Sequence, residues 1–202
     1  MRSRWRCTPA PRAALPDGED HRLESLFARA TSIEVVDYAL PSGATVPLRR
    51  LCVRFGTASP DRLKPGSLPH TYTVKPLVTF NGAAMFGELA VLRWLETDGW
   101  QGVWLDAFHA RKNWREMPTR GVPVALPAPQ RALYERIIAA NGGRASGMFD
   151  VMAWRADRTI FVEYKGPGDR PNRNEQRWVD SAIASGISPN DLLVVTAVDP
   201  GT

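Results

Sequence analysis

The segment Gly147–Arg170 (GMFDVMAWRADRTIFVEYKGPGDR) constrains the fold of this chain more than any other. Two runs within it, 147–154 and 159–165, are rich in β-branched and aromatic residues. A short polar break, 155–158, separates them. Two such runs on either side of a short polar break are typical of a β-hairpin. We therefore expect two antiparallel strands here.

The register of this hairpin follows from its turn. If the turn is centred on Ala156 and Asp157, the numbers of paired residues sum to 313, for a two-residue or a four-residue loop alike. Asp150 then lies opposite Glu163. Opposed side chains have Cβ atoms about 4.5–5.5 Å apart, and like charges placed there repel each other. The pair therefore needs either good solvation or a cation between the carboxylates.

Strand alternation places Asp150, Glu163 and Lys165 on one face of the hairpin, beside Met and Phe side chains. Two carboxylates and a lysine on a partly buried face suit a hard divalent cation with oxygen ligands, such as magnesium. A solvated strand face with an ordinary Glu–Lys pair is the alternative, and the hairpin alone leaves both open.

A third acid comes from the segment before the hairpin. Residues 72–80 predict a strand that leads to Asn81-Gly82, and a helix is expected from about Ala83 to Thr97. Glu88 falls on the apolar stripe of that helix, where an uncompensated charge is costly. An Arg or Lys partner would satisfy it, or a position at the rim of the stripe. Beside the hairpin, Glu88 is also a candidate third carboxylate.

A second helix is expected after the hairpin, from about Asn172 to Ser185. Asn172 and Glu175 are spaced as a variant of the capping box. Helical periodicity turns Gln176 inward on the first turn. The cationic side chains Arg170, Arg173 and Arg177 lie on a different face, where they could meet phosphates.

The segment after the predicted strand 102–108 carries Arg111, Lys112 and Arg115 around Trp114. Cations for phosphates and a ring for stacking suit a nucleic-acid surface. A solvated loop with Trp114 folded back onto the protein is an equal alternative. The net charge of +5 favours an anionic partner, of which nucleic acid is the commonest.

The chain divides into three parts. Residues 1–20, rich in Arg, Pro and Ala, are expected to be a disordered tail. Residues 21–69 predict a β-rich extension of unknown role, with a short helix over 21–30 and a hairpin of strands 32–40 and 45–55. Residues 70–199 form the main α/β domain, which ends in the strand 191–198 and includes a basic insertion at about 109–144 with a helix over 129–141.

Several classes of protein are not favoured. No apolar run is long enough to cross a bilayer, and the basic N-terminus lacks the apolar middle of a secretory signal, so we expect a cytoplasmic protein without a membrane partner. Cys7 and Cys52 lie far apart and give neither a disulfide framework nor a zinc signature. The three histidines show no metal-ligand spacing. The run Gly166-Pro167-Gly168 before a helix is only a weak signal for a phosphate-binding loop, because it lacks a third glycine and the Lys-Ser/Thr of a P-loop.

The order of these elements is helix with Glu88, strand, strand with Asp150, strand with Glu163 and Lys165, helix with Gln176, strand. In this order the chain resembles the αβββαβ core of the PD-(D/E)XK nuclease superfamily, and more narrowly the VRR-NUC (virus-type replication-repair nuclease) domain. The similarity covers roughly 72–198 and is most specific over 147–178. Its motifs are GMFD at 147–150, FVEYKGPGDR at 161–170 and QRW at 176–178. Phe149 departs from the family, which usually has proline there.

The resemblance implies a restriction-endonuclease-like α/β fold with a mixed sheet flanked by helices. It also implies a nuclease that hydrolyses DNA phosphodiesters with Mg²⁺ or Mn²⁺, in repair, replication, or a phage or mobile-element context. Asp150 and Glu163 would be metal ligands, joined by Glu88 and the backbone carbonyl of Tyr164. Lys165 would orient or activate the attacking water and Gln176 would support the site. Glu135 competes with Glu88 for the place of the helix acid, and a nucleic-acid-binding module that no longer cuts is the alternative function. The resemblance fixes neither the substrate structure nor the oligomeric state.

Overall fold

The computed structural model describes residues 7, 23–59, 72, 75–107, 112–118 and 122–198. The strands are β1 (Ala30–Ala39), β2 (Thr45–Arg54), β3 (Gly56–Ala58), β4 (Leu77–Phe80), β5 (Ala83–Phe86), β6 (Gln101–Asp106), β7 (Lys112–Trp114), β8 (Val151–Arg155), β9 (Arg158–Lys165) and β10 (Leu192–Val198). The helices are α1 (Glu24–Ala28), α2 (Gly87–Thr97), α3 (Ala128–Ala140), α4 (Arg173–Ala184) and the 3₁₀ turn η4 (Pro189–Asp191).

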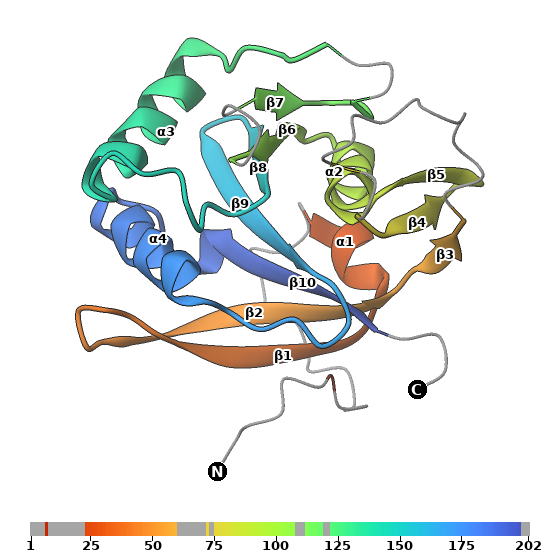
Figure 1. The fold of residues 1–202 in the computed structure, drawn as a ribbon, viewed down its shortest axis with the longest axis horizontal. Helices are drawn as coiled ribbons and strands as arrows, with labels where there is room; N and C mark the ends of the chain where they lie inside the picture. The colour runs from red at the N-terminus through yellow and green to blue at the C-terminus, as the bar shows by residue number, and fades with distance from the viewer. Residues whose placement is uncertain are drawn as a thin grey trace.

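The fold is mixed α/β, as expected (Figure 1). Seven strands form the main sheet in the order β1-β2-β10-β9-β8-β6-β7, and β3-β4-β5 form a small separate sheet. β10 runs parallel to both β2 and β9, and the other pairs of the main sheet are antiparallel. The expected order of helix, three strands, helix and strand is found in α2, β6, β8, β9, α4 and β10, with β7 and α3 inserted after β6.

The hairpin expected in the N-terminal extension is present, and it continues the main sheet. β1 and β2 pair from Ala39 with Thr45 to Ala30 with Val53, with one shift of register between Ala30 and Ser32. β2 then pairs with β10, the last strand of the chain. The N-terminal hairpin therefore shares one sheet with the strands that carry the candidate site.

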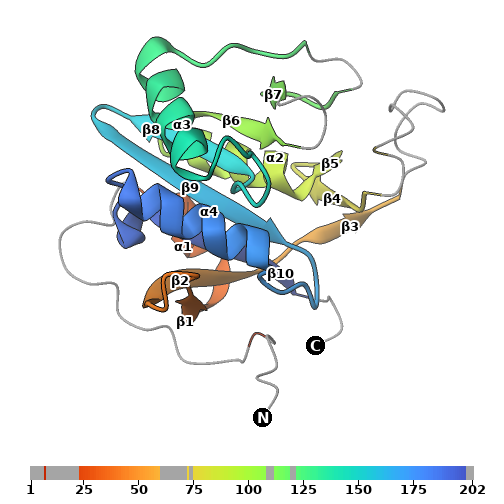
Figure 2. The same ribbon diagram turned by 60° about the vertical axis from the view of Figure 1, so that its left-hand side comes forward.

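Helices cover both faces of the sheet (Figures 1 and 2). On one face, α1 and α2 bury leucine and aromatic side chains against β8 and β9, together with the small sheet. On the other face, α4 packs through Trp178, Val179 and Ala182, and α3 contributes Ile137. α4 begins as expected: Asn172 and Glu175 form a reciprocal capping box at its N-terminus.

The central hairpin has the expected register. Val151 pairs with Val162 and Arg155 with Arg158, so paired numbers sum to 313. The loop has two residues, and Ala156 in it adopts a positive φ of 53°. This is the geometry of the tight turns that suit the right-handed twist of a hairpin.

The start of α2 was predicted too early. Ala83–Phe86 forms β5, and the helix begins at Gly87. Asn81 and Gly82 both have positive φ, 47° and 79°, and they turn the chain back as a hairpin. Asn-Gly is the strongest short hairpin signal, and it acts here before the helix can begin.

Two further expectations are corrected or decided. Cys7 and Cys52 form a disulfide across a separation of 45 residues, which the sequence interpretation did not foresee. Distance along the chain does not prevent pairing, because the fold brings Cys7 beside Cys52 of β2. Trp114 is buried against the α2 side of the core, so the folded-back alternative holds and the ring is not free for stacking.

Candidate functional site

The candidate site lies where β8 and β9 separate, and we call this place the fork. Their pairing ends at Val151 and Val162. Beyond that point the Tyr164 N–H donates to Oδ2 of Asp150, at 2.9 Å, in place of a backbone carbonyl of the ladder. The Asp150 carbonyl accepts from the Leu105 N–H, at 2.6 Å. The first contact holds the Asp150 carboxylate in the fork between the two strands, and the second ties the Asp150 backbone to β6.

On the α4 side of this fork, Lys165 is locked between two glutamates. Its Nζ lies 2.8 Å from Glu163 Oε1 and 2.7 Å from Glu175 Oε1. All three side chains are buried. Glu175 also accepts hydrogen bonds from the backbone and side chain of Asn172, so the N-terminal cap of α4 fixes one partner of the lysine.

On the α2 side, Glu88 is buried and forms an ion pair with Lys75, 2.5 Å from Nζ to Oε1. The same ammonium lies over the rings of Trp104 and Phe86, 4.9 and 5.5 Å from their centroids. This is one of the two alternatives expected for Glu88, a basic partner in the core.

Glycines allow the backbones around the site to approach closely. A Cβ at Gly87, next to Glu88, would lie 2.1 Å from the Tyr164 ring. A Cβ at Gly147 would lie 2.1 Å from backbone atoms of Asn174, and Gly147 has a φ of +81°. The first turns of α2 and α4 therefore press against the hairpin from opposite sides.

The carboxylates influence one another. Burial, and then the charge of Glu88, raise the pKa of Asp150 to about 7, against the pull of Lys75 and of the Tyr164 N–H. Burial, and then the charge of Asp150, raise the pKa of Glu163 well above its usual value. Asp150 thus lies within electrostatic range of both glutamates.

The donor set fits a hard cation. Within the described part of the chain, Glu88 Oε2 and Glu163 Oε2 are buried without a hydrogen-bond partner. Carboxylate oxygens of this kind are what Mg²⁺ and Mn²⁺ prefer. Glu88, Asp150 and Glu163 do not, however, have ligand atoms all within 4.8 Å of one another; among the described residues only Cys7, Glu34 and Cys52 do. Two of those three are the bonded cysteines, so that group is no metal site.

The remaining expected site residues have different positions. Tyr164 lies beside the fork and pairs with Val195 of β10. Gln176 is half-buried in the first turn of α4, and it is its neighbour Glu175 that reaches Lys165. Glu135, the rival of Glu88, is exposed on α3, which favours Glu88.

The cationic residues expected to contact DNA fall into two groups. Arg170 and Arg173 are exposed in the connection from Lys165 to α4, and Arg177, half-buried, bonds Asn174. Lys112 and Arg115 lie on and after β7, the edge strand, where Arg115 pairs with Glu96 at 2.9 Å. Arg111 lies outside the described residues.

Three residues near the fork were not assigned to the site from the sequence. Lys75 precedes a proline in a segment without a motif, and Asp106 ends β6, where the Tyr72 hydroxyl donates to it. Glu175 was identified as a capping acid only. Whether an acid is buried beside Lys165 depends on how segments distant in sequence pack together. The one sequence signal for Glu175 was that it directly precedes Gln176.

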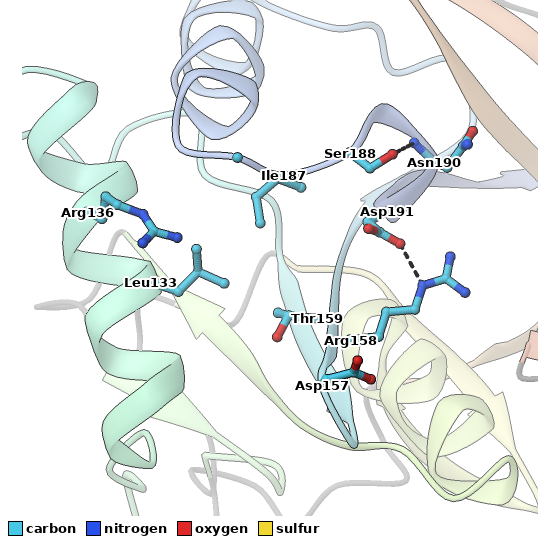
Figure 3. A pocket seen from close by; sticks show the side chains of 10 residues that line it. Leu133, Arg136, Asp157, Arg158, Thr159, Ile187, Ser188, Asn190 and Asp191 are labelled. Atoms are coloured by element: carbon cyan, nitrogen blue, oxygen red, sulfur yellow. Dashed lines mark hydrogen bonds and ion pairs between the residues drawn. The ribbon is translucent and has the colours of Figure 1, made fainter.

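A hollow of about 640 Å³ lies at the opposite end of the hairpin (Figure 3). It is lined by the turn residue Asp157 and by the ion pair of Arg158 with Asp191, 2.7 Å long. Leu133 and Arg136 of α3 face it from the other side. None of the candidate site residues lines it, so it is separate from the fork.

Fold and site together define a mixed α/β protein with a buried cluster of acids and lysines at the fork of a central hairpin. Comparison with protein-family models, with curated proteins and with solved structures gives no match to this chain. No helix among the described residues is long and apolar enough to span a bilayer. The function must therefore be argued from the site itself.

Proposed function

We propose that this protein is a divalent-metal-dependent nuclease that hydrolyses phosphodiester bonds in DNA, with a PD-(D/E)XK core of the VRR-NUC type. The observation that carries the proposal is the fork. A carboxylate with a raised pKa stands there between two buried glutamates, each with one oxygen that has no hydrogen-bond partner in the described structure. A protein that needed only stability would have no use for acids gathered in this way.

The proposal assigns each residue a task. Asp150, Glu163 and Glu88 supply carboxylate oxygens to Mg²⁺ or Mn²⁺, and the Tyr164 carbonyl is a further oxygen ligand. When bound, such a cation lowers the pKa of water and neutralises charge on the phosphate. Lys165 holds one oxygen of Glu163 in place and stabilises negative charge that develops on the phosphate. Gln176 supports the site from the first turn of α4.

The exposed Arg and Lys side chains bind the phosphates of the DNA and so position it at the site. Arg170 and Arg173 follow directly on the strand that carries Lys165, so phosphates near the fork would pass them. Lys112 and Arg115 extend a cationic surface along the far edge of the sheet. The proposed setting is DNA repair, replication or the processing of mobile or phage DNA.

A non-cutting nucleic-acid-binding module is the second candidate, and one observation favours it. Lys75 and Lys165 already neutralise Glu88 and Glu163, and the three carboxylates are not within 4.8 Å of one another. In a binding module of this kind, Lys75 and Lys165 neutralise the acids, so that no metal cation is needed.

One experiment separates the two functions. Labelled linear, flapped and branched DNA is incubated with the purified protein and with Mg²⁺, Mn²⁺ or EDTA. If the protein is a nuclease, the DNA is cleaved in Mg²⁺ or Mn²⁺ but not in EDTA. Asp150→Asn and Glu163→Gln then abolish cleavage, and the exposed control Glu135→Gln does not. Cleavage that survives both site variants would place the chemistry elsewhere, and tight binding without cleavage in any metal would favour the module.

A further inference from the structure

Lys75 is the more accessible of the two lysines at the fork. The Lys165 side chain is 7% exposed and its ammonium is held by two carboxylates. The Lys75 side chain is 31% exposed, and Glu88 Oε1 is the one acceptor that its ammonium contacts among the described residues. An ammonium has three donors, so Lys75 can bind a further anion without breaking its existing pair.

The ammonium of Lys75 is also held in place. The rings of Trp104 and Phe86 lie under it, and cation–π contacts of this kind favour a fixed position of the cation. Both rings belong to the packed core on the α2 side. Glu88 at 2.5 Å completes the support. A side chain fixed in this way loses less freedom when it binds a ligand.

Its surroundings match an anionic ligand at the fork. The charges of Glu88, Asp150 and Asp106 all act on Lys75, so it lies on the α2 side of the same acidic cluster. A phosphate brought beside Asp150 would be repelled by these acids, and Lys75 has two donors left to offset that repulsion. Lys165 meets the cluster from the α4 side, where Glu163 and Glu175 already take two of its three donors.

We propose that Lys75 is a second substrate-contacting lysine, which donates to a phosphate oxygen of the bound DNA from the α2 side while Lys165 stays between its two glutamates. The proposal rests on the proposed function for the identity of the ligand. It gives the two lysines different tasks: Lys75 binds a phosphate oxygen of the bound DNA, whereas Lys165 keeps Glu163 in position and acts on the charge that develops during hydrolysis.

The test measures DNA binding rather than cleavage. Removing Lys75 alone would leave Glu88 buried without a partner, so the comparison is made in a background without that charge. Glu88→Gln and the double variant Lys75→Met/Glu88→Gln are titrated with a labelled 20-base-pair duplex, at several salt concentrations in Ca²⁺. Arg131→Met, an exposed change of the same charge on α3, is the control. Mn²⁺ binding by calorimetry shows whether the rest of the site is intact.

One lost phosphate contact lowers the slope of log K against log salt by about 0.9. We expect that change, with binding several-fold weaker, in the double variant relative to Glu88→Gln. Mn²⁺ affinity should be equal in these two proteins, and Arg131→Met and Lys75→Arg should keep the wild-type slope.

Equal slopes for Glu88→Gln and the double variant would overturn the proposal, as would a slope loss of the same size in Arg131→Met. The outcome is distinguishable from failure of the nuclease function. If the slope changes but the wild type cuts no DNA, the Lys75 contact stands and the nuclease function is rejected. If the wild type cuts DNA but Glu88→Gln and the double variant have equal slopes, the nuclease function stands and the Lys75 contact is rejected.

Discussion

Asp150→Asn should stabilise the metal-free protein at neutral and higher pH. The asparagine keeps an oxygen that can accept from the Tyr164 N–H, so the fork is preserved, and only the charge is lost. In the wild type this carboxyl has a pKa of about 7 in place of 3.8, because burial and Glu88 oppose its ionisation. A carboxyl whose pKa is raised on folding contributes stability at low pH, and that contribution is lost as pH rises between the two values.

The magnitude follows from the difference between the two pKa values, 3.8 and about 7. Each unit corresponds to about 1.4 kcal/mol, so complete ionisation costs up to about 4 kcal/mol. Asp150 is half-buried, and solvent screening reduces the cost to about 2 kcal/mol. The variant should therefore match the wild type near pH 4 and exceed it by about 2 kcal/mol at pH 8.

Urea unfolding in EDTA between pH 4 and pH 8 measures this difference. Asp157→Asn, an exposed change of the same chemistry in the turn of the same hairpin, is the matched control and should follow the wild type throughout. Saturating Mg²⁺ at 100 times its dissociation constant should raise wild-type stability by about 2.7 kcal/mol and leave Asp150→Asn unchanged.

A variant less stable than the wild type at pH 8, or one with the same pH slope, would refute this account. Either result would mean that the Asp150 charge is well satisfied in the metal-free fold, and that the fork has no need of a cation.

Three further perturbations test the packing around the site. Glu175→Gln should lower the free energy of unfolding by about 1–3 kcal/mol, because Lys165 loses a charged partner, while Glu135→Gln on α3 stays within about 0.5 kcal/mol in the same urea titration. Gly147→Ala should lower the free energy of unfolding by about 2–5 kcal/mol, since the new Cβ clashes with Asn174 and the backbone has a positive φ. Gly143→Ala, at φ +76° with nothing within 4 Å, adds only the backbone strain, so comparing the two variants by thermal unfolding separates the clash from the strain. Reduction of Cys7–Cys52, or Cys52→Ser, should lower stability by about 2–4 kcal/mol through loss of loop closure, and an unfolding midpoint unmoved by reductant would show that the bond does not restrain the chain.

The sequence predicted the parts of this fold that have strong local signals. The hairpin was set by two apolar runs and a two-residue turn, and its register followed by arithmetic. The capping box of α4 was readable because Asn172 and Glu175 have fixed local roles. The burial of Glu88 followed from helical periodicity, since Leu89, Leu92 and Leu95 direct the same stripe inward.

The misses came from interactions between distant segments. No periodicity in the sequence indicates that Lys75 reaches Glu88, because Lys75 lies in an irregular segment before β4. The pairing of β2 with β10 joins residues more than 140 positions apart, so the N-terminal hairpin could not be assigned to the main sheet. The same limit applies to Cys7 with Cys52 and to the burial of Trp114.

Charge balance at the fork links the two functions considered for this protein. Glu88, Asp150, Glu163 and Glu175 face two ammonium groups, which leaves two negative charges when all are ionised. Asp106, which accepts a hydrogen bond from the Tyr72 hydroxyl, adds a further negative charge. Such a cluster repels DNA until most of its negative charge is neutralised, either by protons, as the raised pKa of Asp150 indicates, or by a divalent cation. A nuclease of this design would therefore admit the phosphate only once the cation is in place, and the partly exposed Lys75 would then be available to meet it.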